Sequence, residues 1–194
     1  MERNLISNYK IGIFGGAFDP IHIGHHIIAN IAVDDLQLDK LFIVPTYISP
    51  FKWKEGENDS SFRMDILKKV FKDSKKIEIS DFEIKKRDIS YSIDTINHFS
   101  QSCKGELFLI IGEDNLYSFN KWRNSEEILK KVKLAVFPRK VENYRKINIS
   151  HKFINSPQID ISSSLIRQRI KEGKTIKGMV PQTIYKEVME HYGE

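Results

Sequence analysis

The sequence predicts a doubly wound α/β fold, in which helices cover both faces of a parallel sheet. Two observations support this fold class. Short apolar strand patterns alternate with helical patterns, and the strand segments Leu107–Ile111 (LFLII) and Lys133–Phe137 (KLAVF) are apolar on both faces. A strand without a polar face suits a parallel sheet that is buried between helices. The last quarter of the chain is expected to be mainly helical.

The first predicted unit is a strand, a glycine turn and a helix. Lys10–Phe14 is an apolar strand pattern that stops at Gly15-Gly16, and an apolar stripe with helical spacing starts at Ile27. The later strand patterns are Lys40–Pro45, Lys76–Phe82, Glu106–Ile111 and Val132–Phe137. The later helical patterns are 62–71, 93–99, 126–131, 165–173 and 181–188. The segment 46–58 is rich in proline, glycine and lysine, which predicts a loop.

Length and composition exclude several classes of protein. The 194 residues contain no internal repeat or low-complexity linker, so we expect one domain spanning residues 1–194. The single cysteine, Cys103, excludes an intrachain disulfide and any metal site built on paired thiolates. No segment resembles a secretory signal or a membrane span. We therefore expect a cytoplasmic protein that is not attached to a membrane.

The segment after the first strand, residues 12–26, carries the first functional pattern, GIFGGAFDPIHIGHH. Adjacent glycines and the start of a helix offer backbone amides to a phosphate. His22 and His25 are three residues apart and should point the same way, with Gly24 leaving room for the ligand. A phosphate would draw such imidazoles toward their protonated form. A helix cap, a core histidine pair or a metal site would also explain them, although no third metal ligand lies nearby.

The second functional pattern is the segment 161–167, ISSSLIR. The hydroxyls of Ser162, Ser163 and Ser164 lie at a predicted helix start, where helix amides also bind anions. Arg167 would add a charge-assisted donor for a phosphate. Taken alone, the segment is typical of an ordinary helix cap. The chain contains neither a Walker GxxxxGK[ST] motif nor a GxGxxG motif at the first turn, which argues against a P-loop NTPase and a dinucleotide dehydrogenase.

Together the two patterns resemble the HxGH and ISSTxIR signatures of the nucleotidyltransferase α/β-phosphodiesterase superfamily. From Lys10 to Tyr192 the chain is similar to the bacterial nicotinate-nucleotide adenylyltransferases within it. The resemblance implies a Rossmann-like fold in which both patterns bind ATP. The residues that it assigns to ATP are Gly15, Gly16, Ala17, Phe18, His22, His25, Ser162, Ser163, Ser164 and Arg167.

A third segment, Ser49–Lys52 (SPFK), resembles the family's PPHK. The resemblance places Lys52 on the triphosphate, whereas Phe51 replaces the family's histidine. His22, His25, Lys52 and Arg167 are therefore the expected catalytic residues.

Two further segments resemble those that bind the mononucleotide in the family, and a third resembles a segment that contacts adenine. In SYSIDT, Tyr91 and Ser92 are expected at the nicotinate carboxylate, with Ser92 replacing the family's threonine. In IGEDNL and the residues that follow, Asp114 lies at a strand end and Trp122 would stack on the pyridine ring. Arg139, in FPRK, stands near the family's Arg-Pro-Gly and would lie against adenine.

The implied reaction is transfer of AMP from ATP to nicotinate mononucleotide, which yields nicotinate adenine dinucleotide and pyrophosphate in NAD biosynthesis. Mg²⁺ is expected with ATP, without a dedicated protein metal site. The net charge of +5 suits small anions and does not require nucleic acid. A homo-oligomer is compatible with the sequence. Two alternatives stay open: a sibling adenylyltransferase that uses nicotinamide mononucleotide or phosphopantetheine, and a non-catalytic nucleotide-binding module.

Overall fold

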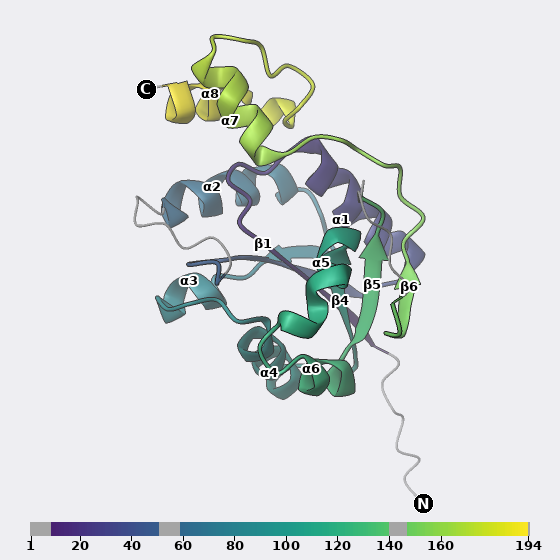
Figure 1. The fold of residues 1–194 in the computed structure, drawn as a ribbon. Coiled ribbons are helices and arrows are strands. Elements are labelled where there is room, and N and C mark those ends of the chain that lie inside the picture. The colour runs from purple at the N-terminus through teal and green to yellow at the C-terminus, as the bar shows by residue number, and fades with distance from the viewer. Residues whose placement is uncertain (1–8, 51–58, 140–146, 194) are drawn as a thin grey trace, which may run out of the picture.

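The computed structural model describes residues 9–50, 59–139 and 147–193, and its centre is a six-stranded parallel sheet. The strand order is β3-β2-β1-β4-β5-β6, and every neighbouring pair is parallel. The predicted doubly wound sheet is therefore confirmed (Figure 1). The strands are β1 (Lys10–Gly16), β2 (Lys40–Pro45), β3 (Ile77–Ile79), β4 (Glu106–Gly112), β5 (Lys133–Phe137) and β6 (His151–Phe153).

Helices cover both faces of this sheet. The α-helices are α1 (Ile23–Asp35), α2 (Ser60–Phe71), α3 (Phe82–Lys86), α4 (Ser92–Ser102), α5 (Glu113–Ser118), α6 (Ser125–Lys131), α7 (Ser163–Lys171) and α8 (Tyr185–Gly193). Two short 3₁₀ helices, η1 (Phe119–Lys121) and η2 (Gln182–Ile184), precede α6 and α8. Helices α7 and α8 form the helical C-terminal portion (Figure 1). Within the described residues, no helix is both long and apolar enough to cross a bilayer.

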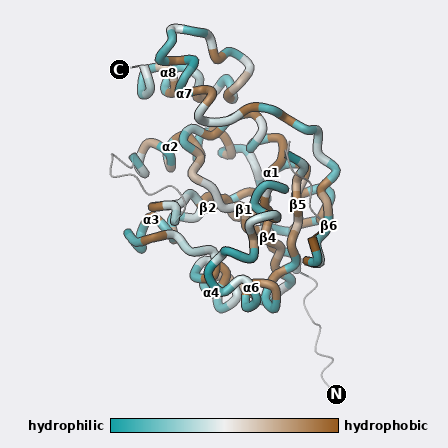
Figure 2. Tube along the Cα trace, viewed as in Figure 1, coloured by the Kyte–Doolittle hydropathy of each residue, from teal (hydrophilic) through white to brown (hydrophobic). Residues whose placement is uncertain are grey.

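The strands build two apolar cores because successive side chains point to opposite faces. In β4, Phe108 and Ile110 face the core that contains α1, α2, α7 and α8. Leu107, Leu109 and Ile111 face the core that contains α4, α5 and α6. Figure 2 shows brown, hydrophobic segments both along the strands and on the helices that cover them. This two-sided burial explains why the strand segments of the sequence lack a polar face.

Several elements differ from the sequence predictions, including α3 and β6, which were not predicted. The strand predicted for Lys76–Phe82 is wrong at its end: β3 stops at Ile79, and Phe82 begins α3. The chain turns between them, where the backbone N–H of Ser80 donates to the carbonyl of Ile43. Helix α5, which follows β4 directly, was not predicted.

The strand order places a topological switch point between β1 and β4. From β1 the chain continues to β2 on one side, whereas β4 leads to β5 on the other. The connections that leave the carboxyl ends of β1 and β4 therefore diverge, and parallel α/β sheets bind ligands at such a point. The β1–α1 turn, residues 15–22, and the start of α5 lie at this edge.

Candidate active site

The start of α1 holds two histidines against each other. His22 is the residue that precedes the helix, and His25 lies in its first turn. Their ring centroids are 3.7 Å apart, and the backbone N–H of His22 donates to Nδ1 of His25 at 3.3 Å. Because Nδ1 accepts this bond, a neutral His25 carries its proton on Nε2. His25 therefore presents an N–H donor away from the helix backbone.

His22 is buried, with 3% of its surface exposed. Its Nδ1 has no hydrogen-bond partner within the described residues. A Cβ at Gly24 would lie 3.0 Å from the His22 ring, so the glycine makes room for this imidazole. That Gly24 also leaves room for a ligand stays a prediction. A buried ring nitrogen without a partner is suited to bind a polar group that arrives with a ligand.

Burial keeps both imidazoles neutral at pH 7. Burial, with a smaller contribution from the charge of Arg139, lowers the pKa of His22 to about 4. Burial also holds the pKa of His25 well below its usual value, and the charges of His22 and Arg139 act in the same direction. At pH 7 the pair thus offers N–H donors rather than positive charges. Protonation would require a bound anion to raise these pKa values.

The start of α7 contacts the β1–α1 turn. The hydroxyl of Ser163 donates to the carbonyl of Pro20 at 2.9 Å. The guanidinium of Arg167 donates to the backbone carbonyl of Asp19 and lies 3.2 Å from its Oδ2. The contacted residues, 19 and 20, immediately precede the histidine pair, although the two patterns are about 140 residues apart in the sequence. The fold therefore brings both predicted phosphate-binding segments to one place.

The individual ATP-binding residues differ in how they face solvent. Gly15 and Ala17 are exposed in the turn, and Ser162 and Ser164 are exposed at the start of α7. The side chain of Phe18, in contrast, is buried, with its ring centroid 5.0 Å from that of His25. Only the backbone of Phe18 is placed to meet a ligand.

The predicted mononucleotide residues gather on the other face of the sheet, around the start of α4. Tyr91 precedes α4, and Ser92 is its first residue. The guanidinium of Arg123 lies 4.6 Å from the centre of the Tyr91 ring. The adjacent Trp122 packs on Phe119, with ring centroids 5.1 Å apart. Arg123 thus connects the tryptophan segment to the start of α4, a contact that sequence reasoning missed.

Arg139 links this part of the site to the histidines. Its guanidinium lies 3.6 Å from the carboxylate of Asp114, which is in the first turn of α5. Its backbone N–H donates to Glu113 at 3.3 Å. Its charge also lowers the pKa of both His22 and His25, so it lies near both rings. The carboxyl ends of β1, β4 and β5 consequently contribute to one charged site.

A family model described as cytidylyltransferase-like matches residues 13–169. A curated relative from Thermotoga maritima, named probable nicotinate-nucleotide adenylyltransferase, is 41% identical, and the match covers 98% of this chain and 96% of the relative. The chain belongs to the nicotinate-nucleotide adenylyltransferase family. A relative from Clostridium tetani with the same name is 37% identical, and the match covers 95% of this chain and 98% of the relative. The same fold is found in the Plasmodium falciparum nicotinic acid mononucleotide adenylyltransferase, solved in complex with NaAD. The TM-score is 0.77 at 17% sequence identity, and the match covers 94% of this chain and 96% of that chain.

As a member of this family the protein is a nucleotidyltransferase. Of its predicted catalytic residues, the structure brings His22, His25 and Arg167 to the same turn. Lys52 and Phe51 lie outside the described residues.

Sequence reasoning missed Arg63, which secures the turn that carries the site. This arginine is buried in α2 and donates to the carbonyls of Ala17, at 2.7 Å, and Thr46, at 2.8 Å. Arg63 therefore links the segment that follows β1 to the segment that follows β2. The sequence contains a signal for the burial of Arg63. It lies on the apolar stripe of its helix, three residues before Ile66 and four before Leu67.

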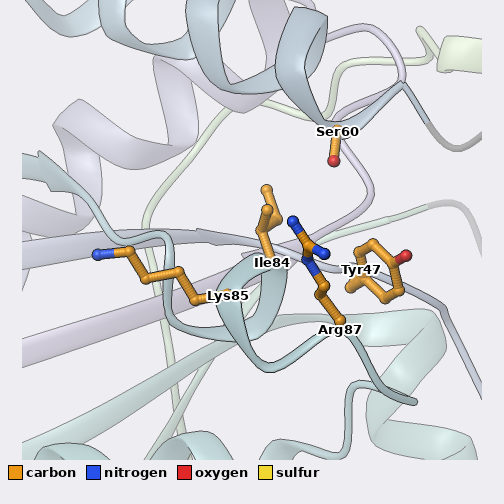
Figure 3. Close-up of a pocket in the computed structure, with 5 residues that line it drawn as sticks. All are labelled: Tyr47, Ser60, Ile84, Lys85 and Arg87. Atoms are coloured by element: carbon orange, nitrogen blue, oxygen red, sulfur yellow. The ribbon is translucent and has the colours of Figure 1, made fainter.

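A cavity of about 500 Å³ lies beside this site, at the carboxyl end of β2. Its lining residues come from the end of β2 and from α2 and α3: Tyr47, Ser60, Ile84, Lys85 and Arg87. Figure 3 shows the guanidinium of Arg87 pointing into the space between Ile84, Tyr47 and Ser60. The described residues that line this cavity include none of those predicted to bind ATP or the mononucleotide.

Proposed function

We propose that the protein transfers AMP from ATP to nicotinate mononucleotide, forming nicotinate adenine dinucleotide and pyrophosphate. The observation that carries this proposal is the contact of Arg167 and Ser163 with the turn that precedes His22 and His25. It joins two anion-binding segments in a chain whose curated relatives are named for this activity. The family resemblance of the segments around Tyr91 and Trp122 supports nicotinate mononucleotide as the acceptor.

In the proposed reaction an oxygen of the mononucleotide's 5′-phosphate attacks the α-phosphorus of ATP. The new P–O bond forms in line with the bond that breaks, and pyrophosphate leaves with the electron pair. A phosphate monoester is already ionised at pH 7, so no general base is needed to create the nucleophile. Catalysis then consists of positioning two anions and stabilising the charge of the transition state. The residues of the site are donors and cations, as this chemistry requires.

Each part of the triphosphate site has a proposed role. The N–H groups of His22 and His25 donate to the α- and β-phosphates as negative charge builds there. Arg167 and Lys52 bind the remaining phosphates and the leaving pyrophosphate. Backbone amides from Gly15 to Phe18 and the hydroxyls at the start of α7 complete the cradle.

The acceptor is proposed to bind at the start of α4. The free backbone N–H groups there, with the hydroxyl of Ser92, are suited to a carboxylate. The indole of Trp122 would stack on the pyridine ring. Asp114 lies at the switch point between the two halves and is held by Arg139.

We further propose that Mg²⁺ enters with ATP, bound to oxygens of the triphosphate. Among the described residues, no group of three or more histidine, cysteine, aspartate or glutamate side chains could hold the ion. The donor set fits an ion held by the nucleotide, with His22, His25 and Arg167 binding the phosphates around it. When bound, Mg²⁺ supplies positive charge that offsets the repulsion between the two anionic substrates.

A pyrophosphate-release assay with a panel of acceptors tests this function. We expect ATP-dependent release with nicotinate mononucleotide, weaker release with nicotinamide mononucleotide, and none with phosphopantetheine or without acceptor. A preference for either of the other acceptors would replace the proposed substrate with that acceptor. Binding of ATP without release for any acceptor would indicate a nucleotide-binding module instead.

A further inference from the structure

The carboxylate of Asp19 joins the β1–α1 turn to both C-terminal helices. Its Oδ1 accepts a hydrogen bond from the hydroxyl of Tyr192, in α8, at 2.7 Å. Its Oδ2 lies 3.2 Å from the guanidinium of Arg167, in α7. The two oxygens are thus divided between a neutral donor and a cation. This arrangement connects residues 19, 167 and 192, and the functional patterns of the sequence include only the first two.

The position of Tyr192 suits a fixed donor. Its ring packs against the core under α2, at 5.9 Å and nearly perpendicular to the ring of Phe62. Burial, followed by the hydrogen bond to Asp19, raises the pKa of Tyr192 far above its usual value. The phenol therefore stays protonated and continues to donate throughout the neutral range.

We propose that Tyr192 is a positioning residue for ATP, which fixes the carboxylate of Asp19 and through it the guanidinium of Arg167. This inference rests on the proposed role of Arg167 in binding the triphosphate. While Tyr192 occupies Oδ1, Asp19 offers only Oδ2 to Arg167, whose remaining N–H groups can face phosphates. Without the phenol, the carboxylate can turn and bind Arg167 with both oxygens. Arg167 would then be drawn toward Asp19, and its charge would be offset before ATP arrives.

The proposal predicts that the effect is confined to ATP. Arg167, Tyr192 and the β1–α1 turn lie with the core that contains α1, α2, α7 and α8. Tyr91 and Trp122, of the proposed acceptor site, pack against the core on the opposite face of the sheet. A general loss of structure would affect both substrates, whereas a displaced Arg167 would affect only one.

The decisive variant is Tyr192→Phe, which keeps the ring and removes the hydroxyl. Its matched control is Tyr185→Phe on the same helix, because the hydroxyl of Tyr185 has no polar partner in the described part of the chain. We expect Tyr192→Phe to raise the KM for ATP about three- to tenfold, less than the full loss of a hydrogen bond to a charged group because the effect reaches ATP only through Asp19 and Arg167, and to leave the KM for the acceptor unchanged. Tyr185→Phe should change neither KM. Unchanged KM values in Tyr192→Phe, or an equal rise in both together with a lower Tm, would overturn the proposal.

Binding of a non-hydrolysable ATP analogue separates this proposal from the proposed function. Titration calorimetry with α,β-methylene-ATP needs no acceptor, so it reports on Tyr192 even if the acceptor is a different molecule. We expect a similar three- to tenfold rise in Kd for Tyr192→Phe, and no further rise when this change is added to Asp19→Asn. An additional loss of affinity in the double variant would show that Tyr192 acts independently of Asp19 and would contradict the proposal. Should Asp19→Asn fail to fold, the comparison of Tyr192→Phe with Tyr185→Phe decides the question.

Discussion

The starts of α1 and α7 face the same proposed triphosphate, but they are built in different ways. At α1, His22 is buried and packed on His25, and both imidazoles are kept neutral by their surroundings. At α7, Ser162 and Ser164 are exposed, and Arg167 carries its charge on a partly exposed side chain. The difference indicates a division of labour. The start of α1 supplies fixed, uncharged donors from the core, and the start of α7 supplies positive charge held by surface hydrogen bonds.

The largest effect should come from the fixed donors. We expect His22→Ala to lower kcat by about 10²- to 10³-fold, the usual cost of removing one donor from a transition state, while the circular dichroism spectrum stays native. His26→Ala is the control, since the ring of His26 lies against Phe71, with centroids 5.5 Å apart, on the same helix. Near-normal turnover by His22→Ala would remove this histidine from the mechanism.

At the start of α7, the expected loss of activity comes from removing the positive charge of Arg167. Arg167→Ala is expected to lower kcat/KM for ATP about 10- to 100-fold, because a charge-assisted contact to phosphate is lost. The same change should leave the KM for the acceptor within about twofold, since the proposed acceptor site packs on the opposite core. Arg169→Ala, on the same helix, provides the control, because its guanidinium donates to the carbonyl of Thr175. If both arginine variants behaved alike, the effect would be one of net charge and not of position.

The two helix starts should also respond differently to acid. The pKa of His22 is about 4 in the folded protein and near 6.5 in the unfolded chain, so the unfolded state takes up its proton first as the pH falls. The stability that a neutral His22 provides is complete above pH 6.5 and is lost as the pH falls toward 4. The expected loss in the free energy of unfolding is on the order of 2 kcal/mol.

Urea unfolding at pH 7 and pH 4.5 measures this loss. His22→Gln should make the dependence on pH shallower, with His25 still contributing in the same direction, whereas Arg167→Ala should leave it unchanged. An equally steep fall in His22→Gln would assign the acid sensitivity to other groups.

The smallest effect should come from the cap of α7. The hydroxyl of Ser162 accepts a hydrogen bond from the backbone N–H of Leu165 at 3.1 Å, so Ser162→Ala should cost about 1 kcal/mol of stability. For a chain of this size that corresponds to about 2–4 °C in Tm, which differential scanning calorimetry resolves. Ser162→Asn keeps a capping oxygen and should restore most of the loss. A Tm unchanged by Ser162→Ala would mean that tertiary contacts alone hold this helix start.

The sequence predicted the parts of the fold that depend on local pattern. Lys40–Pro45 was assigned its observed bounds because the short apolar run at residues 41–45 between polar segments has few other interpretations. Helix α3 was missed because it is only five residues long, and its first residue, Phe82, was assigned to the preceding strand. Helix α5 was missed because its sequence, EDNLYS, has no apolar stripe. Short elements of this kind are determined by tertiary contacts, which periodicity does not report.

The same distinction applies to the site. His22 and His25 could be identified because their chemistry is encoded in a spacing of three residues. The shared carboxylate of Asp19 could not, because it depends on how α7 and α8 dock against the first turn. The neutrality of the histidines could not be predicted either, since it results from burial and from Arg139, which follows β5. Contacts between segments far apart in the chain require the folded structure.

A crystal structure with α,β-methylene-ATP tests most directly whether the two helix starts act on one nucleotide. The phosphates should lie within hydrogen-bond distance of an imidazole nitrogen of the α1 pair and of the Arg167 guanidinium in the same complex. A triphosphate bound only by α1, with Arg167 still turned to Asp19, would contradict the shared site, as would a nucleotide bound elsewhere on the protein.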